Sequence, residues 1–156
     1  QAGLLGQIPM VLSEPSLDGV ILGAVGDAAI GIKGTTHWAA DFDNAASQEM
    51  VAAWTAKYPD RPMTTYAQQS YDTAKLIASA FAKTGGVDDM DALRAALKSA
   101  DFTSTRGNFA FGANQHPVQD WYLTEVVAGP GGKPEGKTLE MLRENVGDIY
   151  AAECKM

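Results

Sequence analysis

Apolar and polar positions along the first quarter of the chain change their period twice. The apolar run Ile8–Leu12 predicts a short buried strand that ends at polar residues. A helical repeat follows it, formed by Leu17, Ile21, Val25 and Ala28. Gly31 stands where this helix is expected to end, and residues 32–38 predict a second strand.

Three consecutive helices are predicted in the middle of the chain. Residues 41–62 begin with Asp and Asn caps and end at two prolines, with Met50, Trp54 and Tyr58 at helical spacing. Residues 64–86 form the clearest helix, which ends at two glycines. Its expected apolar stripe consists of Ala67, Tyr71, Ala74, Ala78 and Phe81. Residues 88–100 predict a short amphipathic helix with acidic residues at its start.

The last third of the chain returns to strand-like patterns. Residues 108–112 alternate in polarity, residues 120–127 predict a strand, and residues 128–136 have the composition of a turn. The tail from Lys137 onward fits either a strand or a short helix. Strands that alternate with helices indicate an α/β fold with a parallel sheet. Three helices in a row are unusual for a small α/β domain, so the pattern suggests pieces of a larger structure.

Composition and charge narrow the function. The chain has 156 residues, of which 46% are hydrophobic and 20% charged, and this fits one packed domain. Its net charge of −7 disfavours nucleic acid and anionic membranes as partners. No apolar run reaches transmembrane length, and no signal peptide is visible. Gln1 in place of an initiator Met favours a processed or truncated end.

One segment, residues 131–138, matches the phosphate-binding pattern G-x-x-x-x-G-K-[ST]. That loop works because successive backbone N–H groups point at the phosphates. Pro134 has no N–H group, Glu135 adds a negative charge, and only 18 residues follow Thr138, with no second motif to hold Mg²⁺. The segment is therefore expected to be a hairpin turn, and a nucleotide-binding enzyme using Lys137 and Thr138 is kept as an alternative.

Candidate ligand-binding residues lie where predicted strands and helices end or begin. Glu14 follows the first strand, and His37 and Trp38 close the second, at the edge where open α/β sheets bind ligands. Tyr66, Gln68 and Gln69 open the long helix, where such side chains either line a pocket or pack. No metal site is expected, because His37 and His116 lack further ligands at suitable spacing, and the single Cys154 has no nearby base.

Several segments resemble one protein family. They are "AGLLGQIPMVLSEPSL", "AQQSYDTAKLI", "RGNFAFGANQHP" and "DWYLTEVV". With them the whole chain resembles the C-terminal portion of a periplasmic solute-binding protein of ABC transporters, of the leucine/isoleucine/valine-binding family. Within that family, "NQHPVQDWYL" is most similar to members that take up aromatic acids, alongside the branched-chain amino acid binders.

The resemblance implies a fold of two Rossmann-like lobes joined by three crossovers, with the ligand held between the lobes. Residues 1–37 would belong to the second lobe, residues 38–121 to the first, and residues 122–156 to the second again. Glu14 would then pair with a ligand ammonium, and Tyr66 would lie against the ligand side chain. His37 and Trp38 would face the cleft, and Gln68 is expected to contact the ligand from the helix start.

The function expected from this resemblance is binding, without catalysis. The chain would belong to the periplasmic component that delivers a small amino acid or aromatic acid to the membrane subunits of an ABC transporter, with no cofactor and no metal. Hinge closure at the crossovers would bury the ligand. A receptor-type regulatory domain of the same fold is the remaining alternative.

Overall fold

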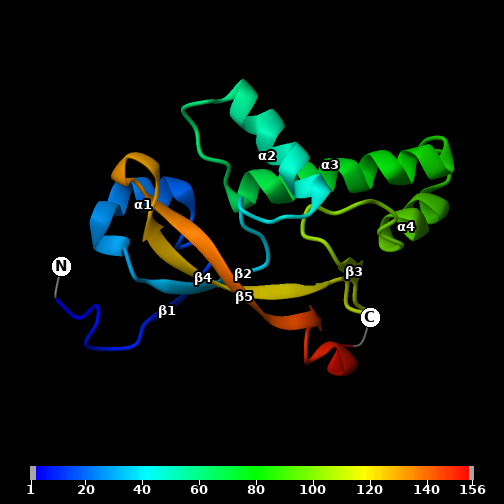
Figure 1. Ribbon diagram of the computed structural model, residues 1–156. Helices are drawn as coiled ribbons and strands as arrows, with labels where there is room; N and C mark the ends of the chain where they lie inside the picture. Colours follow the sequence, from blue (N-terminus) through cyan, green and yellow to red (C-terminus); the bar gives the residue numbers. More distant parts are fainter. Residues whose placement is uncertain (1–2, 155–156) are drawn as a thin grey trace.

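The protein is represented by a computed structural model, and the structure describes residues 3–154. Helices and strands alternate in its first part, and strands dominate its last part (Figure 1). In chain order the elements are β1 (Val11–Ser13), α1 (Gly19–Val25), the 3-10 helix η1 (Gly26–Ala29), β2 (Lys33–Thr36), α2 (Ala45–Lys57), α3 (Thr65–Thr84), α4 (Met90–Lys98), β3 (Phe109–Phe111), β4 (Pro117–Ala128), the 3-10 helix η2 (Pro130–Gly132), β5 (Pro134–Val146) and the 3-10 helix η3 (Ala151–Glu153). This mixture confirms the α/β class.

The strands form one mixed sheet with β4 at its centre. β1 pairs with β2 in parallel, and β2, β3 and β5 each pair with β4 in the antiparallel sense. The parallel part of the sheet is therefore the β1–β2 pair, whose strands are joined through α1. The antiparallel part arises because β4 and β5 are joined by a short turn, which only antiparallel neighbours can use.

The ambiguous tail of the chain forms the long strand β5. It pairs with β4 from Gln119↔Val146 to Ala128↔Pro134, and the turn between the two strands contains Gly131 and Gly132 at positive φ. Two glycines suit this turn because they adopt such angles without steric cost. The segment that matches the phosphate-loop pattern is thus a hairpin turn followed by a strand, as expected from Pro134 and Glu135.

Side-chain caps mark where the helices begin, close to the predicted positions. Asn44 caps α2 through Ser47 N, Thr64 caps α3 through Ala67 N, and Asp89 caps α4. α3 ends at Gly85, which adopts the left-handed conformation favoured at that position. These local signals explain why the predicted middle helices agree with the structure.

The buried apolar side chains form three separate clusters. The first contains Leu22, Ala29 and Val126, and so joins the α1 region to β4. The second contains Trp38, Phe42 and Met50, with Tyr122 packed against it. The third contains Ala80, Leu93 and Ala96, between α3 and α4.

Two predicted apolar faces are wrong. In α3, Tyr71, Ala74, Ala78 and Phe81 are exposed, and the buried residues are Thr65, Gln68, Asp72 and Ala80. In α1, Ile21 and Val25 are exposed, whereas Leu22 is buried. The reason is that polar groups of α3 bond to the segment after α4, which turns the polar face inward. Met50 of α2 and Leu93 of α4 are buried as predicted.

Among the helices of the described residues, none is long and apolar enough to cross a membrane. The longest, α3, carries polar residues on the face that it buries.

Gly34 in β2 provides a test of the sheet packing. A Cβ at Gly34 would collide with Leu17 Cδ1 and would lie 2.9 Å from the carbonyl oxygen of Leu12, which cannot move without disturbing β1. Gly34→Ala should therefore lower the free energy of unfolding of the intact protein by about 1–3 kcal/mol, measured by urea denaturation.

Gly23 is the matched control, because it lies in α1 and a Cβ there meets nothing within 4 Å. Gly23→Ala should leave stability unchanged or raise it by about 0.5–1 kcal/mol, since alanine favours the helix. Equal effects of the two substitutions would contradict the described register between β1 and β2.

Candidate functional site

Two of the predicted ligand-binding residues meet at the ends of the parallel strands. Glu14 follows β1 and His37 follows β2, so the pairing of the strands brings the two side chains to one edge of the sheet. His37 Nδ1 lies 3.4 Å from Glu14 Oε2, and the two side chains are only 9% and 11% exposed. The structure thus places a buried polar pair at the edge where the strand-end rule puts ligands.

Burial sets the protonation of this pair. It raises the pKa of Glu14 from 4.5 to about 7, against the smaller effect of a hydrogen bond from the Thr36 side chain. It also lowers the pKa of His37 from 6.5 to about 4, assisted by the nearby positive charge of Arg106. Although the distance fits an ion pair, both shifts favour the neutral forms, and we describe the pair as an imidazole beside a carboxyl group that titrates near neutral pH.

The pair retains unused hydrogen-bonding capacity. Within residues 3–154, the buried Oε1 atom of Glu14 has no hydrogen-bond partner. The other ring nitrogen of His37 lies 3.3 Å from the amide nitrogen of Gln69, and an amide that donates there leaves the ring proton on Nδ1, facing Glu14. The rings of His37 and Trp121 also meet in a T-shaped arrangement, with 5.7 Å between their centroids. A buried carboxyl oxygen without a hydrogen-bond partner is energetically costly.

The remaining predicted contacts lie in different surroundings. Tyr66 is 61% exposed in the first turn of α3. Trp38 is 3% exposed, and its ring nitrogen donates to Ser47 Oγ at 2.8 Å. Gln68 is fully buried, and its amide donates to Asp72 and to Thr105. Of the two adjacent glutamines, Gln69 is the one that reaches the Glu14–His37 pair.

A buried charge network lies next to the site, and of its members only Gln68 is part of the sequence-based prediction, where it was expected to contact the ligand. The carboxylate of Asp72 accepts hydrogen bonds from Gln68, Ser104 and Thr105, at 2.6–3.1 Å. Arg106 lies beside it, with 3.7 Å between Nε and the nearer carboxylate oxygen. The sequence offers one signal for this network, the charged residue Asp72 within α3. That signal can be recognised only when the buried face of α3 is known.

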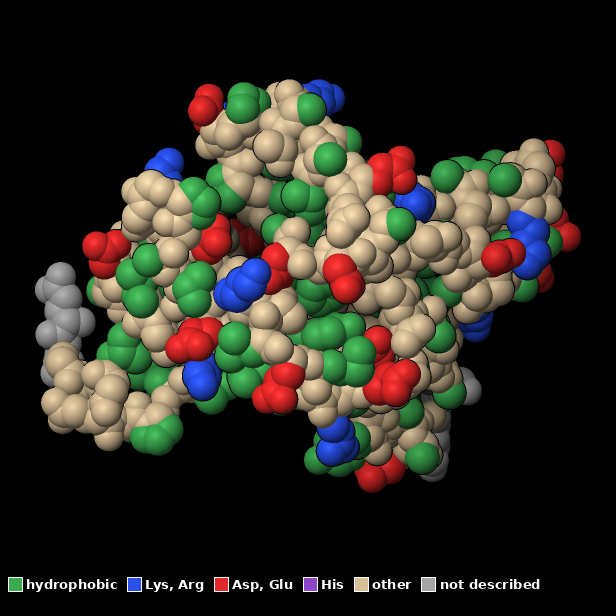
Figure 2. All heavy atoms as spheres, in the orientation of Figure 1, with side chains coloured by type: hydrophobic (Ala, Val, Ile, Leu, Met, Phe, Trp, Pro, Cys, Tyr) green, Lys and Arg blue, Asp and Glu red, His purple; other side chains and the backbone are tan. Residues whose placement is uncertain are grey.

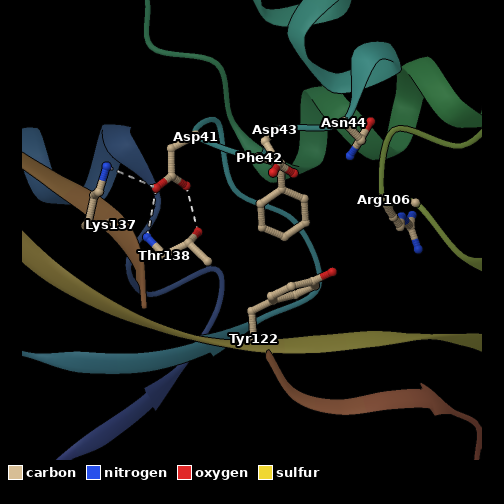
Figure 3. A pocket seen from close by; sticks show the side chains of 9 residues that line it. Asp41, Phe42, Asp43, Asn44, Arg106, Tyr122, Lys137 and Thr138 are labelled. Carbon is tan, nitrogen blue, oxygen red and sulfur yellow. Dashed lines mark hydrogen bonds and ion pairs between the residues drawn. The ribbon is translucent and has the colours of Figure 1, made fainter. Parts of the chain in front are cut away.

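A cavity of about 370 Å³ opens beside Arg106. Its walls come from the segment after β2, from the Arg106 turn and from β4 and β5; they are Asp41, Phe42, Asp43, Asn44, Arg106, Gly107, Tyr122, Lys137 and Thr138. In Figure 3 the Phe42 ring stands above Tyr122, with Arg106 and Asn44 at one end and Asp41 at the other. The centroids of the two aromatic rings are 4.5 Å apart.

The two residues that would define a phosphate-binding loop are engaged elsewhere. Thr138 donates from its backbone N–H and from its hydroxyl to the carboxylate of Asp41, at 2.9 and 2.7 Å. Lys137 Nζ lies 3.8 Å from the same carboxylate (Figure 3). Both residues belong to β5, whose backbone pairs with β4. Because the backbone N–H groups of this strand do not converge on one point, the segment does not form a phosphate-binding loop.

His116 and Cys154 lie at exposed positions in the described part of the chain. Residues 3–154 contain no cluster of three or more His, Cys, Asp or Glu side chains that could hold a metal ion. His116 precedes β4, is mostly exposed and lies 3.7 Å from a carboxylate oxygen of Asp148. Cys154 is a free, exposed thiol.

The face drawn in Figure 2 carries acidic and basic side chains scattered among apolar ones. The chain has a net charge of −7. The face in Figure 2 shows no basic patch of the kind that nucleic-acid interfaces require.

The family model described as periplasmic binding protein matches residues 1–133. The chain therefore belongs to the periplasmic binding protein family, and its resemblance to the leucine/isoleucine/valine-binding type is confirmed. No curated protein matches the chain.

Three solved structures illustrate the likeness. A solute-binding protein of an ABC transporter from R. palustris, in complex with benzoate, is 35% identical, with a TM-score of 0.82 over 96% of this chain and 39% of its own. An ABC transporter substrate-binding protein from Sphaerobacter thermophilus is 32% identical, with a TM-score of 0.83 over 92% of this chain and 39% of its own. A solute-binding protein from Rhodopseudomonas palustris HaA2, in complex with p-hydroxybenzoic acid, is 26% identical, with a TM-score of 0.80 over 96% of this chain and 40% of its own. The chain thus spans about two fifths of these proteins.

The opposite pKa shifts of Glu14 and His37 predict opposite pH dependences. Glu14 has a folded pKa of about 7 against 4.5, so its contribution to the free energy of unfolding falls as pH rises through this window. His37 has a folded pKa of about 4 against 6.5, so its contribution rises as pH rises through that window. In the wild-type protein these two contributions have opposite signs, so they largely cancel each other over the pH range that the two windows share.

Single substitutions should separate these contributions in urea denaturation from pH 4 to 8. Relative to wild type, Glu14→Gln should gain stability as pH rises from 4.5 to 7, by up to about 3 kcal/mol. His37→Gln should instead lose stability, relative to wild type, as pH rises from 4 to 6.5. Glu49→Gln is the control, because it removes a carboxylate at an exposed position. Parallel pH curves for all four proteins would contradict the buried, neutral pair.

Proposed function

We propose that this chain is part of the extracytoplasmic, solute-binding component of an ABC transporter, and that its solute is a small aromatic carboxylate. The observation that carries the proposal is the buried pair of Glu14 and His37 at the ends of parallel strands, with a carboxyl oxygen that lacks a hydrogen-bond partner among residues 3–154. A binding protein needs such a group to hold a ligand, and the similar solved proteins are described as solute-binding proteins of ABC transporters. The protein is therefore proposed to bind and release its solute unchanged.

The ligand class is chosen from the relatives. Two similar proteins, at 35% and 26% identity, are described with benzoate and with p-hydroxybenzoic acid. Amino acids are the other class expected from the resemblance, and Glu14 would then meet an ammonium group. For a hydroxylated aromatic acid, the same oxygen of Glu14 would accept a hydrogen bond from the ligand hydroxyl. Tyr66 would supply an aromatic surface for the ring.

The two-lobe assignment remains part of this proposal. Residues 1–37 and 122–156 would belong to the second lobe, and residues 38–121 to the first. The separation of the apolar clusters supports it, because Leu22, Ala29 and Val126 combine the two outer segments. The cluster of Ala80, Leu93 and Ala96 lies wholly within the middle one.

Closure of the two lobes would bury the ligand and produce the form that the membrane subunits recognise. A ligand shifts the population toward the closed form only as far as it binds that form better. We propose a periplasmic location for the protein, with the membrane subunits of the transporter as its partners, and its membership of the periplasmic binding protein family supports this. No cofactor or metal has a role in this scheme.

Thermal unfolding of the intact protein against a ligand panel tests the proposal. The panel holds benzoate, 4-hydroxybenzoate, leucine and Mg·ATP. A ligand that binds only the folded state raises the midpoint. We expect the aromatic acids to raise it and Mg·ATP to leave it unchanged. A shift with leucine alone would move the ligand to the amino acid class, and no shift with any solute would contradict the proposed function.

Substitutions at the proposed contacts should weaken binding without unfolding the protein. Tyr66→Ala and Glu14→Gln should each lower the affinity for the best ligand of the panel at least tenfold, about 1.4 kcal/mol, in isothermal titration calorimetry. Tyr150→Ala is the matched control, because Tyr150 is 63% exposed against 61% for Tyr66 but lies near the end of the chain. Unchanged affinity in both Tyr66→Ala and Glu14→Gln would rule out this site.

A further inference from the structure

The carboxylate of Asp41 joins two segments of the chain that lie 97 positions apart. It accepts hydrogen bonds from the hydroxyl and the backbone N–H of Thr138, at 2.7 and 2.9 Å, and Lys137 Nζ lies 3.8 Å from it. Figure 3 shows the three residues facing one another, with Asp41 on the segment after β2 and its partners on β5. Hydrogen bonds to a charged group are stronger than neutral ones. We call this contact the Asp41 clamp.

The segment that carries Asp41 is fastened to the proposed first lobe. The ring nitrogen of Trp38 donates to Ser47 Oγ at 2.8 Å, in the first turn of α2. The side-chain amide of Asn44 donates to the carbonyl oxygen of Thr105 at 3.0 Å. All four of these residues belong to residues 38–121. Asp41 is therefore expected to move with the first lobe.

The partners of Asp41 are fastened to the proposed second lobe. Thr138 in β5 pairs with Thr124 in β4. The hydroxyl of Thr124 donates to the carbonyl oxygen of Gly34 in β2 at 3.2 Å, and β2 pairs with β1. These strand residues belong to the two outer segments of the chain. The Asp41 clamp therefore bridges the two lobes through side-chain contacts, in addition to the chain connections between them.

The clamp and the polar pair at the strand ends lie on opposite faces of β4. Successive side chains of a strand point to opposite faces of its sheet. In β4 the ring of Trp121 meets the ring of His37, whereas the ring of the next residue, Tyr122, packs against Phe42 beside the clamp. Thr124, which pairs with the clamp residue on β5, follows two positions after Tyr122 and so faces the same side.

This arrangement couples the clamp to closure of the lobes. A hinge that closes on one side of its connecting strands opens on the other side. Closure over the polar pair would separate the segment after β2 from β5, and Asp41 would lose its partners. Both segments also line the cavity of about 370 Å³ beside the clamp, which would widen in the same motion. A ligand then has to supply the free energy that breaks these contacts.

We propose that the Asp41 clamp is a conformational device that holds the two lobes open and thereby lowers the affinity of the protein for its solute. This inference rests on the proposed function, because it requires two lobes that close on a solute. The apparent affinity of a binding protein falls with the fraction of molecules that can adopt the binding-competent form. Loss of the clamp raises that fraction, so binding becomes tighter without any change at the ligand contacts.

The test removes the clamp from either side in the intact protein. Asp41→Ala removes the acceptor. Thr138→Val removes one donor and keeps a side chain that suits a strand. The double variant shows whether the two residues act as one contact. Asp43→Ala is the matched control, because it removes an equal charge from an exposed position in the wall of the same cavity.

Three measurements are made on each variant. Calorimetry gives the affinity for the best ligand of the panel, and small-angle X-ray scattering gives the radius of gyration of the ligand-free protein. Urea denaturation verifies cooperative unfolding. A contact with a purely structural role would change the free energy of unfolding and leave the affinity and the radius of gyration unchanged.

We expect Asp41→Ala to raise the affinity by about threefold or more and to decrease the radius of gyration of the ligand-free protein. Thr138→Val should act in the same direction by a smaller factor, and the double variant should not exceed Asp41→Ala. Asp43→Ala should bind like the wild type.

An unchanged or lower affinity of Asp41→Ala, with cooperative unfolding preserved, would overturn the clamp while the proposed function stands. If Asp41→Ala does not unfold cooperatively, the direction of the change in Thr138→Val decides the question. If the wild-type protein binds no solute of the panel, the proposed function itself fails.

Discussion

The buried carboxylate of Asp72 is the interaction on which the middle of the molecule depends. It lies on α3, 3% exposed, and accepts hydrogen bonds from the segment that follows α4. Removing a charge of this kind from water costs several kcal/mol unless hydrogen bonds replace the hydration. Because Ser104 and Thr105 provide that replacement, Asp72 fixes the rotation of α3 and the position of the neighbouring Arg106. The polar face of the helix is buried for this reason.

The same rotation of α3 determines which of its side chains lie next to Glu14 and His37 at the ends of β1 and β2. With Gln68 turned inward to Asp72, Gln69 points toward His37, and Tyr66 stays exposed at the helix start. Glu14 and His37 are then enclosed enough for burial to favour their neutral forms. Among the described residues, one oxygen of this enclosed carboxyl group has no hydrogen-bond partner, and the proposed function assigns that oxygen to a ligand.

Burying the polar face leaves apolar side chains uncovered. Tyr71, Ile77 and Phe81 of α3 are exposed, as are Ile21 and Val25 of α1. Exposed apolar surface of this extent is typical of faces that pack against other parts of a protein. Since the chain spans 39% of the length of its similar solute-binding proteins, these faces agree with the proposed two-lobe arrangement, in which neighbouring elements would cover them.

The sequence by itself determined the order and kind of most elements, because caps, glycines and hydrophobic periods act locally. It also placed Glu14 and His37 at strand ends. Tertiary structure decided the rest. The tail became β5 because β4 offers it a pairing edge, and its strand and helix tendencies were otherwise balanced. The buried face of α3 and the position of Gln69 depend on hydrogen bonds between residues more than 30 positions apart, such as Thr105 to Asp72, and no local pattern encodes such contacts.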